Sequence, residues 1–356
     1  MKNKLNKIFS LLKKKGLIYT FNRIHFALFF NTKNPLLIKF LYLTNPYPSY
    51  IEVETTTACD LKCTICEHTY WKEPIYNMTF SQFKSIIDQF PKLKWIGLTS
   101  IGESFLNPDF IKIIEYVKSK NIYVEIYDNL YFLDKNTIEK LINLQIDKIF
   151  ISLDGATKET YEKIRVGANF DKAVENIKYL INFKKDSNSF IPEIAFHFVI
   201  NKENISEINQ FIDFTYSITG KDTKIQFSQL LHNFKEVEKL FIRIPRLIIK
   251  DADTKARKLG IKLSWNEDAS LKKADIKKCT QWIMPFIFAT GEVIPCCAKN
   301  EANQRNLQKQ TSMGNIFQTP FKKIWNGEKY KNLRKTILMS KTPVQCENCP
   351  LYENCN

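Results

Sequence analysis

The sequence predicts an α/β fold, a partial (β/α)6 TIM-like barrel followed by a small C-terminal cysteine-rich metal-cluster domain. Two observations lead to this prediction. Between residue 50 and about residue 230, short β-rich runs alternate with apolar stripes at helical spacing, which indicates a mostly parallel sheet covered by helices. From about residue 271 this alternation stops, and cysteines return among glycine and proline residues. Such a segment is typical of a small domain that metal holds together.

The barrel prediction rests on six strand candidates, each bounded by turn residues. They lie at Tyr50–Thr56, Trp95–Thr99, Ile122–Tyr127, Lys148–Leu153, Glu193–Ile200 and Thr223–Phe227. The segments between them have helical periodicity, and Asp134 stands where a helix N-cap is expected. A doubly wound sheet would give the same alternation. In either architecture, ligands bind at the carboxyl ends of the strands.

The chain of 356 residues therefore divides into four predicted parts. They are a basic amphipathic extension over 1–48, the partial barrel over 49–231, a lysine-rich helical connector over 232–270 and the cysteine-rich domain over 271–356. In the extension, Leu5, Ile8, Leu11 and Leu12 fall at helical spacing among lysines. That helix would either pack on the barrel or lie on a membrane surface. Without a signal-peptide pattern or a spanning apolar run, we expect a cytoplasmic protein, with residues 1–45 as candidates for peripheral contact at the inner membrane face.

Charge and cysteine content narrow the class of protein. There are 53 Lys and Arg against 37 Asp and Glu, a formal net charge of +16. A solvated lysine-rich surface explains this, and so would an anionic substrate, a membrane surface or nucleic acid. The nine cysteines fall in three groups, at 59–66, 279–297 and 346–355. In a cytosolic protein such groups indicate metal sites rather than disulfides.

The first cysteine group directly follows the first predicted strand. Cys59, Cys63 and Cys66 form a Cys-x3-Cys-x2-Cys loop that offers three thiolates. A structural zinc site requires four closed ligands, which His68 or a distant cysteine would have to complete. A 4Fe–4S cluster held by three cysteines keeps one iron open to a substrate or cofactor. At the mouth of a barrel, that open iron predicts a catalytic centre.

These residues resemble the radical S-adenosylmethionine (SAM) superfamily over roughly residues 50–230. The resemblance implies that Cys59, Cys63 and Cys66 bind the cluster and that Ile65 packs on the SAM adenine, where relatives usually have an aromatic residue. It further implies SAM contacts at the ends of later strands and in the next helix. The residues concerned are Gly102, Glu103, Asn129, Ser152, Asp154 and Arg165.

Each of these SAM contacts has a structural alternative. Glu103 could cap the next helix, Asp154 with Gly155 could form only a turn, and Arg165 could make a surface ion pair. Their shared position at strand ends favours the functional interpretation.

The C-terminal cysteines resemble the auxiliary-cluster extension of the same superfamily, known as SPASM or, in a shorter form, twitch. The resemblance implies one auxiliary 4Fe–4S cluster, with a second left open because the sequence given stops at Asn356. The ligands it implies are Cys279, Cys296, Cys346 and Cys349, with Cys355 as a substitute or spare. Cys297 is interpreted as a buried thiol, since adjacent side chains rarely point at one site. Structural zinc is the alternative here as well.

The implied function is reductive cleavage of SAM to a 5′-deoxyadenosyl radical, which takes a hydrogen atom from a substrate. The resemblance implies a net oxidation or a carbon-centred modification of the substrate. The substrate classes it implies are a peptide, a protein, or a small molecule, including anionic and lipid-linked sugar-like compounds. It also implies an electron donor such as flavodoxin or ferredoxin. The alternative from another class is a non-catalytic zinc protein that binds nucleic acid, against which the spread of basic residues argues.

Overall fold

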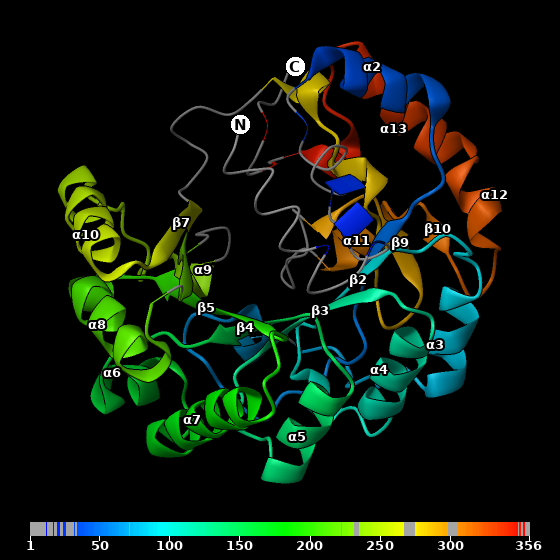
Figure 1. Ribbon diagram of the computed structural model, residues 1–356. Helices are drawn as coiled ribbons and strands as arrows, with labels where there is room; N and C mark the ends of the chain where they lie inside the picture. The colour runs from blue at the N-terminus through cyan, green and yellow to red at the C-terminus, as the bar shows by residue number, and fades with distance from the viewer. Residues whose placement is uncertain are drawn as a thin grey trace.

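A computed structural model of the chain describes residues 34–70, 72–221, 223–230, 235–266, 275–297 and 305–347, with a few single positions outside these ranges. Its centre is a curved sheet of ten strands with helices on its outer face (Figure 1). The strand order is β10-β9-β8-β1-β2-β3-β4-β5-β6-β7. This architecture confirms the predicted α/β partial barrel.

Seven neighbouring strands of the sheet run parallel. They are β1 (Tyr50–Val53), β2 (Trp95–Leu98), β3 (Tyr123–Asp128), β4 (Lys148–Ser152), β5 (Glu193–Ile200), β6 (Lys224–Gln229) and β7 (Lys262–Asn266). The larger helices on their outer side are α3 (Phe80–Ile87), α4 (Phe110–Ser119), α5 (Lys135–Asn143), α6 (Lys158–Ile164), α7 (Phe170–Asp186), α8 (Ile208–Thr219) and α10 (Arg246–Leu259). A short helix, α9 (Lys235–Glu238), follows β6.

Alternation along the strands separates an apolar outer face from a polar interior. On β5, Phe196 and Phe198 are fully buried, and the Phe198 ring lies 4.6 Å from that of Phe211 on α8. His197 between them points the other way, into the barrel, where its ring meets the edge of Tyr127 at 6.0 Å. The interior is therefore available for binding polar groups.

Local signals start the helices as the sequence predicts. Asp134 caps α5 by accepting from the Thr137 amide at 2.7 Å. Thr79 and Gln82 form a reciprocal capping box at the start of α3. Asp109 precedes α4 but accepts instead from the amide of Phe80, the first residue of α3, at 2.9 Å. The α3 and α4 helices are thus tied together at their amino ends.

The segment predicted as a helical connector, 232–270, also contains a strand, so that prediction is wrong for 262–266. β7 pairs in parallel with β6 and extends the sheet, while α10 supplies the expected helix. The strand has only two apolar residues, Leu263 and Trp265, which pack against the hydrophobic core and alternate with polar residues. The Trp265 ring stacks on Phe227 at 4.7 Å, a contact that local periodicity does not reveal.

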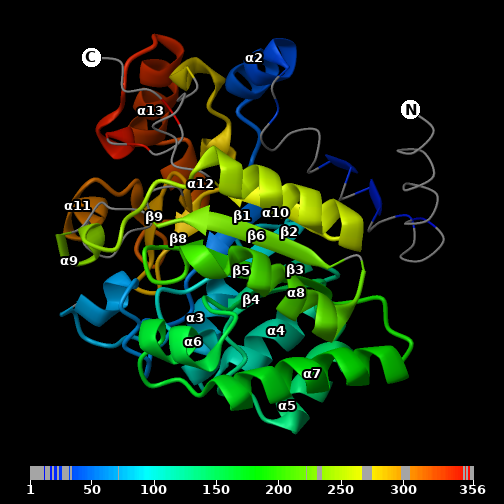
Figure 2. The same cartoon turned by 90° about the vertical axis from the view of Figure 1, so that its left-hand side faces the viewer.

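The cysteine-rich segment continues the barrel sheet instead of forming a detached module. β8 (Phe286–Ile287) pairs in parallel with β1, and β9 (Glu292–Ile294) and β10 (Gly314–Asn315) follow in antiparallel order. Around these strands lie α11 (Arg305–Gln310), α12 (Phe321–Trp325) and α13 (Glu328–Leu338). α2 (Pro35–Thr44) packs here too, and Tyr42 donates to the Cys279 carbonyl at 2.8 Å (Figure 2).

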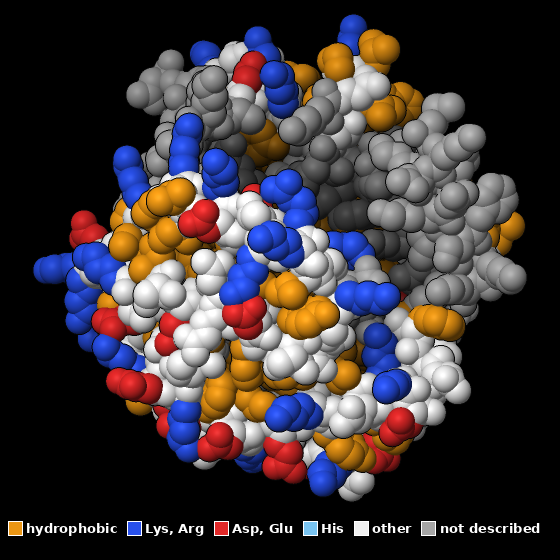
Figure 3. All heavy atoms as spheres, turned by 60° about the vertical axis from the view of Figure 1, so that its left-hand side comes forward, with side chains coloured by type: hydrophobic (Ala, Val, Ile, Leu, Met, Phe, Trp, Pro, Cys, Tyr) orange, Lys and Arg blue, Asp and Glu red, His pale blue; other side chains and the backbone are white. Residues whose placement is uncertain are grey.

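Leu5, Ile8 and Leu11 of the predicted amphipathic helix lie outside the described residues. Within the described part of the chain, no helix combines the length and apolar character needed to cross a bilayer. On the side that carries α8 and α10, Lys and Arg side chains are spread over the surface among acidic ones (Figure 3). The excess positive charge is therefore not gathered into one stripe on this face.

Candidate active site

A cavity of about 570 Å³ opens at the carboxyl ends of the parallel strands. Cys59, Cys63 and Cys66 line it together with Ile65. The other predicted SAM-contact residues line the same cavity: Gly102, Glu103, Asn129, Ser152, Asp154 and Arg165. Residues spread over more than a hundred positions of sequence thus meet at one site.

Backbone hydrogen bonds hold the cysteine loop from two sides. The Lys62 and Thr64 amides donate to the carbonyls of Val166 and Ile164 at 2.9 and 2.8 Å, which ties the loop to the end of α6. On the other side, the Glu103 amide donates to the Ala58 carbonyl at 2.7 Å. A Cβ on Gly102 would lie only 2.1 Å from that carbonyl oxygen, so only glycine permits this approach.

The three thiols of the loop share one buried environment. Burial raises the pKa of Cys63 to about 11 and that of Cys66 to about 12, and Cys59 adds to both shifts. Arg165 opposes the shift at Cys63. Within the described residues, no three His, Cys, Asp or Glu side chains converge closely enough to hold a single metal ion. A 4Fe–4S cluster needs a wider spacing, because each cysteine binds a different iron.

Glu103 and Asp128 form a pair of buried carboxyl groups in the cavity wall. Asn129 donates to Glu103 Oε2 at 2.7 Å, and the Leu130 amide donates to Asp128 Oδ1 at 2.6 Å. Glu103 Oε1 and Asp128 Oδ2 accept from no other described residue, and the two carboxyl groups hydrogen-bond to each other. Burial and the neighbouring Asp128 raise the pKa of Glu103 well above its usual value. A cationic amine beside this carboxyl pair would stabilise its charged form, so the chemistry of the pair fits the SAM ammonium.

Arg165 faces the cavity and pairs with Asp154 at 2.6 Å, with side-chain exposures of 12% and 1%. The other Asp154 oxygen accepts from the Val199 amide at 2.7 Å. Burial works to lower the pKa of Arg165, but Asp154, Cys63 and Tyr161 together outweigh it and the pKa is raised. This ion pair is buried, unlike the surface pair that the sequence left open. Glu103 likewise makes no side-chain cap for the short helix after it.

Four polar residues of the cavity, Tyr127, His197, Gln226 and Ser228, were not singled out from the sequence. They lie within β3, β5 and β6, whereas the cysteine loop follows the end of β1. His197 Nε2 lies 2.9 Å from Ser228 Oγ. Polar positions alternating with apolar ones along these strands are the signal that could have found them.

The cavity is acidic although the chain is basic. Among its described lining residues are four carboxyl side chains, Glu67, Glu103, Asp128 and Asp154, and one cation, Arg165. Burial lowers the pKa of His197, which keeps the imidazole neutral near pH 7. This lining suits a cationic cofactor such as SAM and a neutral or cationic substrate group.

The predicted auxiliary ligands Cys279, Cys296, Cys346 and Cys349 share tyrosine and cysteine neighbours: Cys279 and Cys346 affect Tyr42 of α2, Cys296 affects Tyr330 of α13, and Cys349 affects Cys279. Burial raises the pKa of Tyr352, and Cys279, Cys349 and Cys296 are all near enough to add to the shift. Cys279 and Cys346 act in the same way on Tyr42. The Cys349 amide donates to the Cys346 carbonyl at 3.1 Å, as expected for a short loop presenting two thiols.

The two further C-terminal cysteines behave differently. Cys297 hydrogen-bonds to Glu52, a residue of β1 that faces the barrel interior. Burial raises the pKa of Glu52 to about 7 and that of Cys297 well above its usual value. Cys297 is therefore a half-buried thiol that points at the barrel interior. Cys355 lies outside the described residues.

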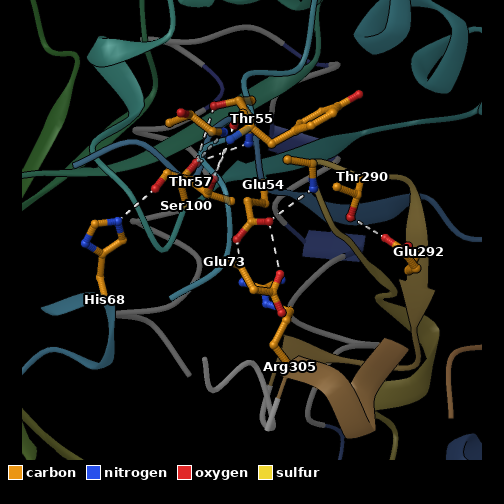
Figure 4. A network of polar contacts seen from close by, with 12 residues as sticks. Glu54, Thr55, Thr57, His68, Glu73, Ser100, Thr290, Glu292 and Arg305 are labelled. Carbon is orange, nitrogen blue, oxygen red and sulfur yellow. Dashed lines mark hydrogen bonds and ion pairs between the residues drawn. The ribbon is translucent and has the colours of Figure 1, made fainter. Parts of the chain in front are cut away.

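A buried ion pair links the C-terminal part to the strand that leads into the cysteine loop (Figure 4). Arg305 of α11 contacts Glu54 through two nitrogens, at 2.8 and 3.3 Å, with side-chain exposures of 3% and 1%. Glu54 also accepts from the Ala289 amide at 3.1 Å, and the guanidinium lies 3.8 Å from the centre of the Phe288 ring. Glu54 stands five residues before Cys59. Sequence reasoning gave this pair no role.

Comparison with known proteins identifies the family. The model of the radical SAM superfamily matches residues 53–215, and that of the SPASM iron–sulfur cluster-binding domain matches residues 279–350. The chain belongs to the radical SAM superfamily and carries a C-terminal SPASM domain. It is an enzyme that uses SAM with a 4Fe–4S cluster, and its SPASM domain binds auxiliary iron–sulfur.

Full-length relatives and solved structures agree with this assignment. The tungsten-containing aldehyde ferredoxin oxidoreductase cofactor-modifying protein of Pyrococcus furiosus is 24% identical, over 86% of this chain and 88% of its own length. The AdoMet-dependent heme synthase of Methanosarcina barkeri is also 24% identical, over 81% and 85%. In fold, Streptococcus suis SuiB bound to S-adenosylmethionine matches with a TM-score of 0.65 at 16% identity, covering 89% of this chain and 74% of SuiB.

Proposed function

We propose that this protein is a radical SAM maturase that modifies an unactivated carbon of a peptide or a cofactor precursor. The observation that carries the proposal is the cavity that holds the three loop cysteines, the buried carboxyl pair of Glu103 and Asp128, and Arg165. The two full-length relatives are described as a cofactor-modifying protein and a heme synthase. SuiB was also solved with its precursor peptide SuiA, and anSMEcpe with a Cp18Cys peptide.

In this proposal the cavity residues divide the work of holding the cluster and SAM. Cys59, Cys63 and Cys66 bind three irons, and Ile65 gives apolar contact to the adenine. Glu103 with Asp128 accepts from the SAM ammonium, while Arg165 contacts its carboxylate. Gly102 lets the chain approach closely. Asn129, Ser152 and Asp154 form the ribose side, where Asp154 also fixes the Arg165 guanidinium.

When bound, the cluster and SAM supply an electron and a 5′-deoxyadenosyl radical that takes hydrogen from the substrate. The residues of the chain orient and shield this chemistry. The apolar residues Leu61, Val199 and Leu230 line the cavity beside the polar ones and limit access of water. Tyr127, His197, Gln226 and Ser228 lie deeper, and we assign them to the substrate.

For the second cysteine group we propose one auxiliary 4Fe–4S cluster on Cys279, Cys296, Cys346 and Cys349, with Cys355 as a substitute ligand. Support comes from the shared electrostatic effect of these thiols on Tyr42 and Tyr352. Such a cluster could accept the second electron of a net oxidation or bind the substrate. Cys297, held by Glu52, is not assigned to it.

The substrate group that enters the cavity is proposed to be neutral or cationic. Glu103, Asp128, Asp154 and Arg165 are assigned to SAM, and the groups left for the substrate, Tyr127, His197, Gln226 and Ser228, offer no cation to a phosphate or carboxylate near pH 7. A peptide backbone or an amine meets the available donors and acceptors. The anionic, lipid-linked substrate that the net charge suggested is therefore disfavoured for the reacting part of the molecule.

The test is anaerobic reconstitution with iron and sulfide, followed by dithionite and SAM, with 5′-deoxyadenosine counted by chromatography. The matched control is a Cys59/Cys63/Cys66→Ala triple variant. We expect 5′-deoxyadenosine only from the wild type, with about eight irons in it and about four left in the variant. If neither protein forms 5′-deoxyadenosine and the wild type holds zinc, the proposal fails.

We further propose a cytoplasmic protein reduced by flavodoxin or ferredoxin, with residues 1–45 in contact with the inner membrane face. The basic amphipathic pattern of residues 2–15 is what supports membrane contact. Liposome flotation of the full chain and of a variant lacking residues 1–45 tests this. If both proteins stay in solution, the membrane contact is excluded.

A further inference from the structure

A second cavity, of about 490 Å³, lies at the opposite end of the parallel strands from the cysteine loop. Its floor is made by the first residues of three neighbouring strands, Glu193 of β5, Lys224 of β6 and Lys262 of β7. The last turn of α7 gives Lys184 and Lys185, and Lys221 comes from the turn before β6. None of these residues belongs to the SAM cavity.

The described residues that line this cavity include five lysines and one carboxylate, Glu193. Lys224 pairs with Glu193 at 2.7 Å, and Lys148 approaches the same carboxylate at 3.9 Å. Lys224 and Lys262 stand side by side in the sheet register, and like charges so placed destabilise a sheet. Among the described residues, Glu193 is the carboxylate that these ion pairs share, and Lys184 and Lys221 lie outside them.

Lys184, one of the lysines that line this cavity, has a pKa that burial changes. It is half-buried, and burial lowers its pKa although Glu193 acts in the opposite direction. Among the described residues neither Lys184 nor Lys221 makes an ion pair. Lys184 and Lys185 lie in the last turn of α7, where the helix dipole stabilises basic side chains. The dipole does not explain why the Lys184 ammonium is partly removed from water and faces a cavity.

The same cavity has an apolar side. Ile181, Ile194 and Phe196 line it, and the Phe190 ring is 61% exposed at its edge. Cations beside an apolar wall fit an organic molecule that carries phosphate better than a free inorganic ion. The acidic SAM cavity and this basic one therefore select opposite charges within one barrel.

We propose that the cavity between the α7 carboxyl end and the first residues of β5–β7 is a binding site for a phosphate-bearing organic ligand, with Lys184, Lys221, Lys224 and Lys262 as its cationic contacts. The phosphate belongs either to a soluble compound or to the headgroup of an anionic phospholipid. The site is independent of radical chemistry, so it stands or falls separately from the proposed function.

The test uses the reconstituted holoenzyme and a Lys184→Gln/Lys221→Gln variant. These two lysines hold no carboxylate among the described residues, so their removal leaves none unpaired. Lys112→Gln/Lys331→Gln is the control with the same change in net charge, since both lysines are exposed on distant helices. The probes are pyrophosphate, followed by calorimetry, and phosphatidylcholine vesicles with or without phosphatidylglycerol, followed by flotation.

For a soluble ligand, we expect pyrophosphate to bind the wild type and the control alike, and the site variant at least about tenfold more weakly, about 1.4 kcal/mol. For a headgroup, flotation with phosphatidylglycerol falls in the site variant and not in the control. The site variant should also melt at the same or a higher temperature without ligand, because it loses a desolvated cation. If the two double variants behave alike with both probes, the proposed site does not exist.

Discussion

Replacing Arg305 by methionine gives the sharpest test of how the SPASM domain supports the radical SAM site. Arg305 is the described side chain that forms an ion pair with Glu54, and both are almost completely buried. Methionine keeps much of the volume but leaves the Glu54 carboxylate with the Ala289 amide as its described hydrogen-bond donor. A buried carboxylate deprived of its cation is costly because water cannot replace the lost charge.

The expected loss follows from this burial. Removing one partner of a buried ion pair costs about 3–5 kcal/mol, a large part of the total stability of a protein. The Phe288 contact at 3.8 Å is lost together with the pair and is included in that figure. With about 2.1 cal/mol/K of unfolding entropy per residue over 356 residues, the melting temperature falls by about 4–7 °C.

The assay is anaerobic thermal unfolding of the holoenzyme for Arg305→Met, Glu54→Gln and the double variant. Glu54→Gln removes the charge that Arg305→Met strands, so the double variant should lose clearly less than the sum of the single losses. Arg305→Lys should fall between wild type and Arg305→Met, since an ammonium cannot reproduce the two-nitrogen contact. A loss below about 1 kcal/mol for Arg305→Met, or strictly additive losses, would refute the reasoning.

Three other perturbations test the cavity. Gly102→Ala places a Cβ on a backbone carbonyl of the cysteine loop and should lower 5′-deoxyadenosine formation at least about tenfold. The control, Gly97→Ala, meets only the Glu52 side chain and should change the activity little. Equal activities of the two variants would contradict the close approach at Gly102. Arg165→Lys should weaken SAM binding about tenfold in equilibrium dialysis, with the iron content unchanged. The reason is that an ammonium cannot replace the planar guanidinium that Asp154 holds in place. An unchanged Kd would count against a role of Arg165 in binding SAM. Because burial holds the pKa of His197 below its unfolded value, the unfolded chain binds the extra proton first, and stability falls as pH drops below about 6.5, by up to about 1.4 kcal/mol per pH unit. His197→Gln should flatten this loss in pH-dependent melts, and parallel curves for the two proteins would exclude the assignment.

The sequence predicts the barrel and the position of its site because both depend on local patterns. Alternating strands and helices give the parallel sheet, and a rule of topology then brings the strand ends together. The spacing of Cys59, Cys63 and Cys66 is itself local, and so the first metal site could be read directly. Gly102 is predicted only as a SAM contact, and the structure shows why glycine stands there: a Cβ would lie 2.1 Å from the Ala58 carbonyl oxygen.

The features that the sequence did not predict depend on contacts between distant segments. β7 has too few apolar residues to stand out, and it is stabilised by Trp265 stacking on Phe227. The continuation of the barrel sheet into β8 depends on pairing across more than two hundred residues. Glu54 and Arg305 are separated by 251 positions, and no spacing rule connects two such residues.

Net charge was the weakest guide to the substrate, and the structure shows why. A formal charge of +16 describes the whole surface, where water and salt screen each lysine within about 10 Å. The SAM cavity is sheltered from that screening, so its own groups decide which ligand enters, and these are mainly carboxyl groups. The second cavity, between the α7 carboxyl end and the first residues of β5–β7, lies at the other end of the strands, and the charged residues described in its lining are mainly lysines. A substrate search guided by total charge would therefore choose anions for a cavity whose described substrate-facing groups offer them no cation, whereas neutral peptides and amines are the compounds to test first.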